Sequence, residues 1–181
     1  PHGKSTRVTA DVVHYVRRPF ISFLTQVYLS CKDYLPDAKA AALPSIWSQP
    51  HCLLTVLTRD LEGLEEGEGR SAAQEEHVDY ICAAVLPLMT ALLAWGHPPH
   101  DAFHNFEGFV AALGAFLRRM GPQLNRQQIR SAKALISALM RVRHPPSKDA
   151  LAQAASCLDK RRETIDDPSL KPPQRDLGDD F

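Results

Sequence analysis

The sequence predicts an all-α fold, and three observations support this prediction. Apolar residues recur every three or four positions almost throughout the chain, which is the helical period, and no stretch alternates convincingly with the two-residue period of a strand. Residues that cap helices precede the apolar runs, and Pro or Gly follows them. With 181 residues, 44% of them hydrophobic, the chain is long enough to form one domain with its own core.

The first three expected helices precede residue 50 and are separated by prolines. Thr9 caps a helix that ends near Arg18, because the proline that follows disfavours helical backbone in the residue before it. The second helix carries one apolar stripe, which we expect to face the core: Phe20, Phe23, Leu24, Val27, Cys31 and Leu35. Pro36 stops this helix, and a short third helix covers 37–43 until Pro44 ends it.

An acidic loop separates the next two expected helices. Pro50 opens the first of them, whose inward positions are all leucine: Leu53, Leu54, Leu57, Leu61 and Leu64. The segment 62–70 contains three glycines and four glutamates with little to bury, which is typical of a mobile loop. Ser71 and Gln74 have the spacing of a capping box and begin a long helix. Pro87 should kink that helix, since it lacks a backbone donor.

Three further helices are predicted in the remainder of the chain. They begin at Asp101, Asn125 and Ser147, and each carries an apolar stripe at helical spacing. The last segment is rich in aspartate and has few apolar anchors, which predicts a disordered or draped tail. We therefore expect a single helical domain over 1–163, followed by an acidic tail over 164–181.

A possible internal repeat bears on the arrangement of these helices. His-Pro-Pro occurs at 97–99 and again at 144–146, each time between an apolar helix end and an Asp-Ala helix start. The two copies are 47 positions apart, and another 47 positions back lies Pro50. A period near 47 resembles the helical-hairpin repeats of the HEAT and armadillo kind. Two arrangements stay open: a right-handed stack of helical hairpins (a HEAT/armadillo-like solenoid) and an irregular six- to seven-helix bundle.

Charge is segregated along the chain although its net value is zero. The balance of basic and acidic residues is +4 over 1–59, −9 over 60–107, +9 over 118–162 and −4 over 163–181. Such blocks of one sign favour electrostatic contacts with a partner or between segments of the same chain.

The strongest site signal is a row of cations on the helix that begins at Asn125. At 100° per residue, four of them fall within an arc of about 80°, away from the apolar face. We call these four the basic ridge: Arg126, Arg130, Lys133 and Arg141. The predicted partner-binding surface is this ridge extended by Arg118, Arg119 and Arg143. The alternative interpretation is a solvated helix face that is neutralised by the acidic 60–107 segment or by the acidic tail.

No catalytic constellation stands out. There is no glycine-rich phosphate loop after a strand and no Gly-x-Ser-x-Gly turn. His97, His100 and His104, with Asp101 among them, form the only metal-like cluster, but it lacks the glutamate of a zinc protease and has no cysteine nearby. We therefore expect a His-rich helix start rather than a metal site. The four cysteines are isolated within apolar patterns and should be small buried hydrophobic residues.

These observations predict a non-enzymatic protein-interaction domain, a scaffold or adaptor within a larger complex. It would bind an acidic or amphipathic partner segment through the basic ridge, without a cofactor or small-molecule substrate. The alternative function is nucleic-acid binding through the same ridge. Proline or charge interrupts the apolar runs short of the roughly 20 residues that cross a bilayer. No signal-like segment opens the sequence. An intracellular location, cytoplasmic or nuclear, is therefore expected.

Overall fold

The computed structural model describes residues 16–29, 36–63, 71–95, 103–142 and 148–166. Every regular element within these ranges is helical, which confirms the predicted all-α class. The elements are α2 (Arg18–Phe23), η2 (Leu24–Leu29), α3 (Pro36–Trp47), α4 (Leu53–Glu62), α5 (Ala72–Tyr80), η3 (Ile81–Val85), α6 (Leu86–Trp95), α7 (Phe103–Met120), η5 (Gly121–Gln123), α8 (Arg126–Met140) and α9 (Lys148–Asp166). The segments η2 and η3 are π-helical and η5 is a 3-10 turn. The helix expected to start at Thr9 lies largely outside the described residues.

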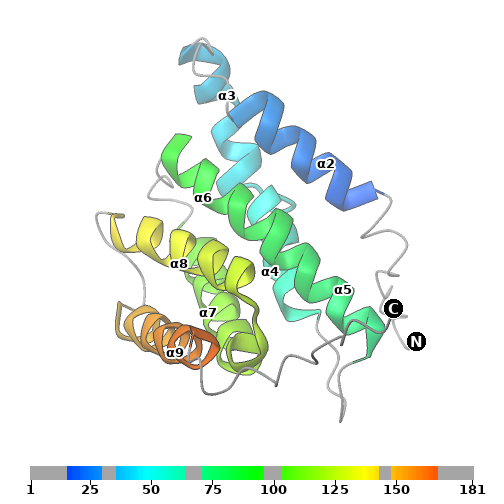
Figure 1. Cartoon of the computed structure of the whole chain (residues 1–181). Coiled ribbons are helices and arrows are strands. Elements are labelled where there is room, and N and C mark those ends of the chain that lie inside the picture. The colour runs from blue at the N-terminus through cyan, green and yellow to red at the C-terminus, as the bar shows by residue number, and fades with distance from the viewer. Residues whose placement is uncertain (1–15, 30–35, 64–70, 96–102, 143–147, 167–181) are drawn as a thin grey trace, which may run out of the picture.

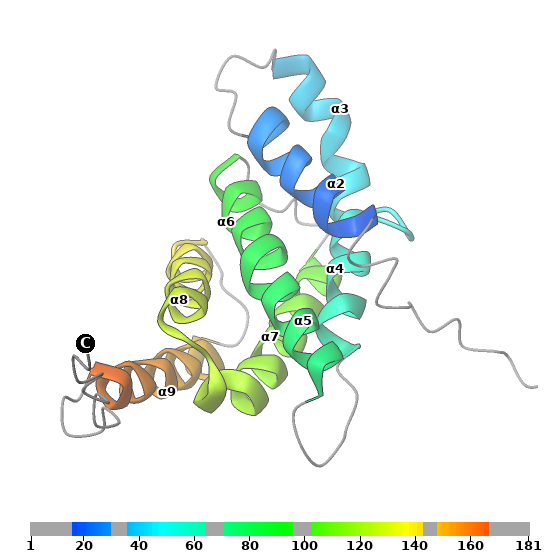
Figure 2. The same ribbon diagram turned by 45° about the vertical axis from the view of Figure 1, so that its right-hand side comes forward.

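A continuous helical stretch, formed by α5, η3 and α6, runs through the middle of the molecule (Figure 1). The helices α2 and η2 pack on one side of this stretch and α8 packs on the other. The helix α4 packs on α7, and α9 packs on α7 and α8 (Figure 2). The core therefore lies between the central stretch and the helices around it. Its largest fully buried side chains include Trp47, Tyr80, Phe106 and Phe109.

Local sequence features explain where the central stretch begins and why it continues past Pro87. Ser71 and Gln74 form the predicted capping box, with both reciprocal hydrogen bonds present. Pro87 lacks the N–H of a regular helical bond, and the turn before it is wider. Leu86 donates its N–H to the carbonyl of Ile81, five residues back. This wider π-helical turn accommodates the proline, which has no N–H to donate. The helices α5 and α6 therefore continue in one direction without a sharp kink between them (Figure 1).

Because Pro87 does not interrupt the helix, the helical stretch as a whole is longer than the apolar runs that the sequence contains. Among the described residues, Ala72–Trp95 is long and apolar enough to cross a membrane by length and composition, with a mean hydropathy of 1.8 over its most apolar window. Of that window, 61% is buried inside the structure, as in the central helix of a packed domain.

Proline also fails to end α3 where the sequence predicted. The helix continues from Pro44 to Trp47, and the N–H groups of Ser48 and Gln49 donate to the carbonyl of Pro44 at 3.0 Å. Continuation brings the Trp47 ring into the core, edge-on to Phe106 with centroids 6.2 Å apart. Burial of this large ring compensates for the backbone bond that Pro44 cannot make. The next helix begins at Leu53 rather than at Pro50.

Three residues of the apolar stripe that was expected to face the core face outward instead, whereas Leu24 packs against the core as predicted, and Cys31 and Leu35 lie outside the described residues. Phe20, Phe23 and Val27 are 58%, 52% and 40% exposed. Ile21 is buried and Leu24 is half-buried, and these two residues contact the core. The helical period marks both sets as apolar faces of one helix, and it does not determine which face packs inward.

The C-terminal helix corrects two further expectations. Cys157 is exposed, because the core side of α9 is formed by Leu151, Ala154 and Leu158, whereas Cys52 and Cys82 are buried as predicted. Cys31 lies outside the described residues. The helix α9 continues to Asp166, so the first residues of the predicted tail are helical.

Candidate functional site

The helix α8 positions the predicted site, and its ends and faces follow from its sequence. Asn125 and Gln128 form a capping box in which each backbone N–H donates to the other residue's side chain at 3.0 Å. This confirms the predicted cap. The core side of the helix is apolar and buried: Ile129, Ala132, Leu135, Ile136 and Leu139. The opposite side therefore presents the cations.

The four ridge residues occupy the positions that helical spacing predicts. Arg126, Arg130 and Lys133 lie on α8, and Arg141 is its C-cap residue. The three arginines are exposed, and Lys133 is half-buried. Arg130 and Arg141 are separated by eleven residues, a rise of about 16 Å along the helix.

The helix α9 neutralises two of the four cations. Arg126 pairs with Asp166, and Lys133 pairs with Asp159. The two cations and the two carboxylates are each seven residues apart but in opposite chain order, so α8 and α9 run in opposite directions along this seam (Figure 1). Arg126 remains exposed although it is paired, so the predicted solvent-facing position is wrong only for Lys133, which is half-buried. One neutralising carboxylate, that of Asp166, belongs to the predicted acidic tail.

Arg130 and Arg141 differ from these paired cations. Both side chains are exposed, and neither forms an ion pair with any residue in the described ranges. Met140 is 44% exposed and lies on the helical wheel beside Lys133, at the edge of the ridge. The exposed part of the ridge thus combines two cations with one apolar side chain.

The structure does not bring the other predicted site residues onto the ridge. Arg118 and Arg119 are exposed in the last turn of α7. A Cβ atom at Gly114 would lie 3.4 Å from Nη1 of Arg118, so this guanidinium extends back along α7. Arg143 lies outside the described residues.

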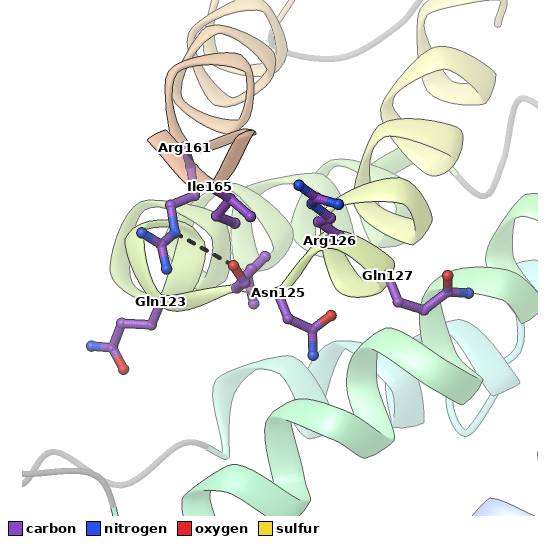
Figure 3. Close-up of a pocket in the computed structure, with 7 residues that line it drawn as sticks. Gln123, Asn125, Arg126, Gln127, Arg161 and Ile165 are labelled. Atoms are coloured by element: carbon purple, nitrogen blue, oxygen red, sulfur yellow. Dashed lines mark hydrogen bonds between the residues drawn. The ribbon is translucent and has the colours of Figure 1, made fainter. Parts of the chain in front are cut away.

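An open cavity of about 520 Å³ lies where α8 begins. Its lining residues are Gln123, Leu124, Asn125, Arg126, Gln127, Arg161 and Ile165. Figure 3 shows Arg161 and Arg126 on either side of Ile165. Arg161 donates through Nε to the carbonyl of Leu124 at 3.4 Å, and Arg126 is paired with Asp166. Both guanidinium groups therefore have partners within the chain, and the surface that lines the cavity is mostly apolar.

Sequence reasoning missed a buried polar cluster around Asp60 on α4. Asp60 is 4% exposed, pairs with Arg17 and accepts a hydrogen bond of 2.7 Å from the hydroxyl of Tyr80. His77 places Nε2 at 2.8 Å from the Asp60 carbonyl. The signal for this cluster is Asp60 itself, because it lies on the leucine stripe of α4 three residues after Leu57.

The electrostatics of this cluster follow from burial. Desolvation raises the pKa of Asp60, while the Tyr80 hydroxyl and the charges of Arg17 and His77 act in the opposite direction. Burial also raises the pKa of Tyr80, and the neighbouring Asp60 carboxylate adds to that increase. The cluster joins the N-terminal side of α2 to α4 and α5. Arg18 adds a second link, because its Nη2 lies 3.0 Å from Asp79.

The structure describes only one residue of the metal-like cluster considered in the sequence analysis. His104 is exposed on α7, whereas His97, His100 and Asp101 lie outside the described residues. Within the described ranges, no group of three or more His, Cys, Asp or Glu side chains is placed to hold a metal ion.

Comparisons of the chain with protein-family models, with curated proteins and with solved structures found no match.

Proposed function

We propose that this chain is a non-enzymatic protein-interaction domain, a scaffold or adaptor within a larger complex. In this proposal an acidic or amphipathic partner segment binds along α8. The observation that carries the proposal is the pair Arg130 and Arg141, two exposed cations on the same side of a capped helix without a counterion among the described residues. Carboxylates of a partner would supply the missing negative charge.

The spacing of the two cations defines the partner segment. A rise of about 16 Å corresponds to eleven residues of a helix or to about five residues of an extended strand. The partner therefore carries two acidic side chains at one of these spacings. Met140 lies at the edge of the ridge, beside Lys133 on the helical wheel, and offers an apolar contact. Such a contact beside a charge pair excludes water and favours an amphipathic segment.

The packing of the helices supports a stack of helical hairpins as the finer architecture. The helix α4 packs on α7, and the central stretch packs on α8, so equivalent helices of two successive hairpins are neighbours. This is the relation between adjacent units of a HEAT-like solenoid. Cys52, Cys82 and Cys157 are thiols, and Cys157 is exposed, which supports an intracellular location for the proposed domain.

The test is an affinity capture from cell lysate with three versions of the chain, each with and without nuclease treatment. The ridge variant carries Arg130→Glu and Arg141→Glu, which leaves the α8–α9 seam intact. The matched control carries Arg59→Glu and Arg118→Glu, which change the net charge equally at exposed positions on α4 and α7. Circular dichroism checks that all three are folded.

We expect one protein partner to be captured by the wild type and the control but lost with the ridge variant, regardless of nuclease. Equal capture by the ridge variant would contradict the site. Loss of all binding to the wild type after nuclease treatment would contradict the proposal and support the nucleic-acid alternative, whose affinity should fall steeply with salt.

A further inference from the structure

The outward side of α2 and η2 is an apolar surface that the proposed function does not use. Val16, Phe20, Phe23 and Val27 are 60%, 58%, 52% and 40% exposed. We call these four residues the outer stripe. Exposed large apolar side chains are ordinary when single, whereas a contiguous row of them marks an interaction surface.

The outer stripe belongs to a helix that is held firmly on its other side. Ile21 is buried in the core, and Arg17 pairs with the buried carboxylate of Asp60. Arg18 pairs with Asp79 on α5. The outward orientation of Phe20 and Phe23 is therefore fixed by contacts on the inner side. The outer stripe is presented on a rigid support, on the opposite side of the central stretch from α8 (Figure 2).

We propose that the outer stripe is a self-association surface, on which a second copy of this chain packs in antiparallel orientation. The pattern of the stripe is the same in both directions, since its spacing is four, three and four residues and its residue types are Val, Phe, Phe and Val. A two-fold axis between Phe20 and Phe23 places Phe20 opposite the partner's Phe23. Val16 then lies opposite the partner's Val27. A two-fold interface requires such self-complementarity, because the same patch is used by both copies.

The distribution of charged residues also favours a second copy of the chain as the partner on the outer stripe. Residues 19–31 contain no Asp, Glu, Lys or Arg, so two copies meet without repulsion between like charges. Arg17 and Arg18 lie between Val16 and Phe20 in the sequence, but they pair with Asp60 and Asp79. A membrane surface is less suitable, because helices that lie on membranes combine an apolar face with unneutralised cations.

The area of the outer stripe determines how strong the association is. Its four side chains expose about 350 Å². A stable dimer buries about 800 Å² on each partner, so the stripe supplies less than half of that area. The dimer should therefore be weak, and association should appear only toward the upper end of an accessible concentration range. It forms at high local concentration, for example when many copies gather on one assembly.

Sedimentation velocity of the full chain tests this proposal over a range from about 5 to about 500 μM. We expect the weight-average mass to rise from the monomer value of 20.1 kDa toward twice that value. Phe20→Glu with Phe23→Glu should stay monomeric throughout. Met140→Glu is the matched control at an exposed apolar position on α8, and it should associate like the wild type. Thermal melts check that both variants are folded.

A mixing experiment tests the antiparallel register. Phe20→Lys and Phe23→Glu are prepared as two separate proteins, each of which should be monomeric. Mixed in equal amounts they should associate, because the new lysine of one chain faces the new glutamate of the other. A wild type that stays at monomer mass at every concentration would overturn the proposal. So would a double glutamate variant that dimerises like the wild type, or a mixture that does not associate.

Discussion

Removal of the Tyr80 hydroxyl tests how the buried cluster around Asp60 holds α5 against α4. In Tyr80→Phe the ring stays in the core and the only loss is the 2.7 Å hydrogen bond to the carboxylate of Asp60. Tyr80 is fully buried and Asp60 is 4% exposed, so water does not readily replace the missing donor. Hydrogen bonds to charged groups contribute about 1.5 to 3 kcal/mol, and we expect a loss of about 2 kcal/mol in the free energy of unfolding at pH 7.

For a chain of this size that loss lowers the melting temperature by about 4 to 8 °C. Urea unfolding followed by far-UV circular dichroism measures the free energy directly. Thr90→Val is the control, because it removes a hydroxyl that only bonds to the carbonyl of Leu86 within α6. It should change stability by no more than about 0.5 kcal/mol. A Tyr80→Phe protein within that same margin of the wild type would refute the view that the hydrogen bond between Tyr80 and Asp60 stabilises the contact of α5 with α4.

Three further changes test other parts of the structure. Asp60→Asn removes the titrating carboxyl group. Because burial raises the pKa of Asp60 above 3.8 in the folded state, the stability of the wild type relative to this variant should fall as pH rises from 3.8 toward the folded pKa. Urea unfolding at several pH values measures this stability difference, and a difference that rises with pH or stays constant would contradict the prediction. Asn125→Ala removes the cap of α8 and should cost about 1 kcal/mol in thermal or urea unfolding, whereas an unchanged free energy would show that the cap is dispensable. Asp159→Asn with Asp166→Asn removes the partners of Lys133 and Arg126, so an acidic partner should bind more tightly and with a steeper salt dependence. Calorimetry measures the affinity, and an unchanged affinity would contradict the view that these two ion pairs limit partner binding.

The sequence predicted those features that depend on local signals. The capping box at Ser71 and the helix start at Asn125 are confirmed, because both depend on side chains close together in the sequence. The core face of α8 was also predicted, since one face of that helix is apolar and the other is charged. Local signals therefore predicted helix starts and clearly amphipathic faces.

Features that depend on tertiary packing were not predictable. The helix α2 has two apolar faces, and only its contact with the central stretch shows that Ile21 faces inward and Phe20 outward. Pro44 and Pro87 are helix breakers by local rules, but burial of Trp47 and a wider turn keep both helices continuous. For the ridge, helical spacing placed the cations on one side, but the pairing of Lys133 with Asp159 depends on how α9 packs.

The most direct test of the central claim is the dissociation constant of the captured partner segment for the wild type, the Arg130→Glu/Arg141→Glu variant and the Arg59→Glu/Arg118→Glu control. Loss of two charge contacts predicts binding at least about tenfold weaker for the ridge variant alone. Equal affinity for all three proteins, or equal weakening in both variants, would contradict the assignment of α8 as the binding surface.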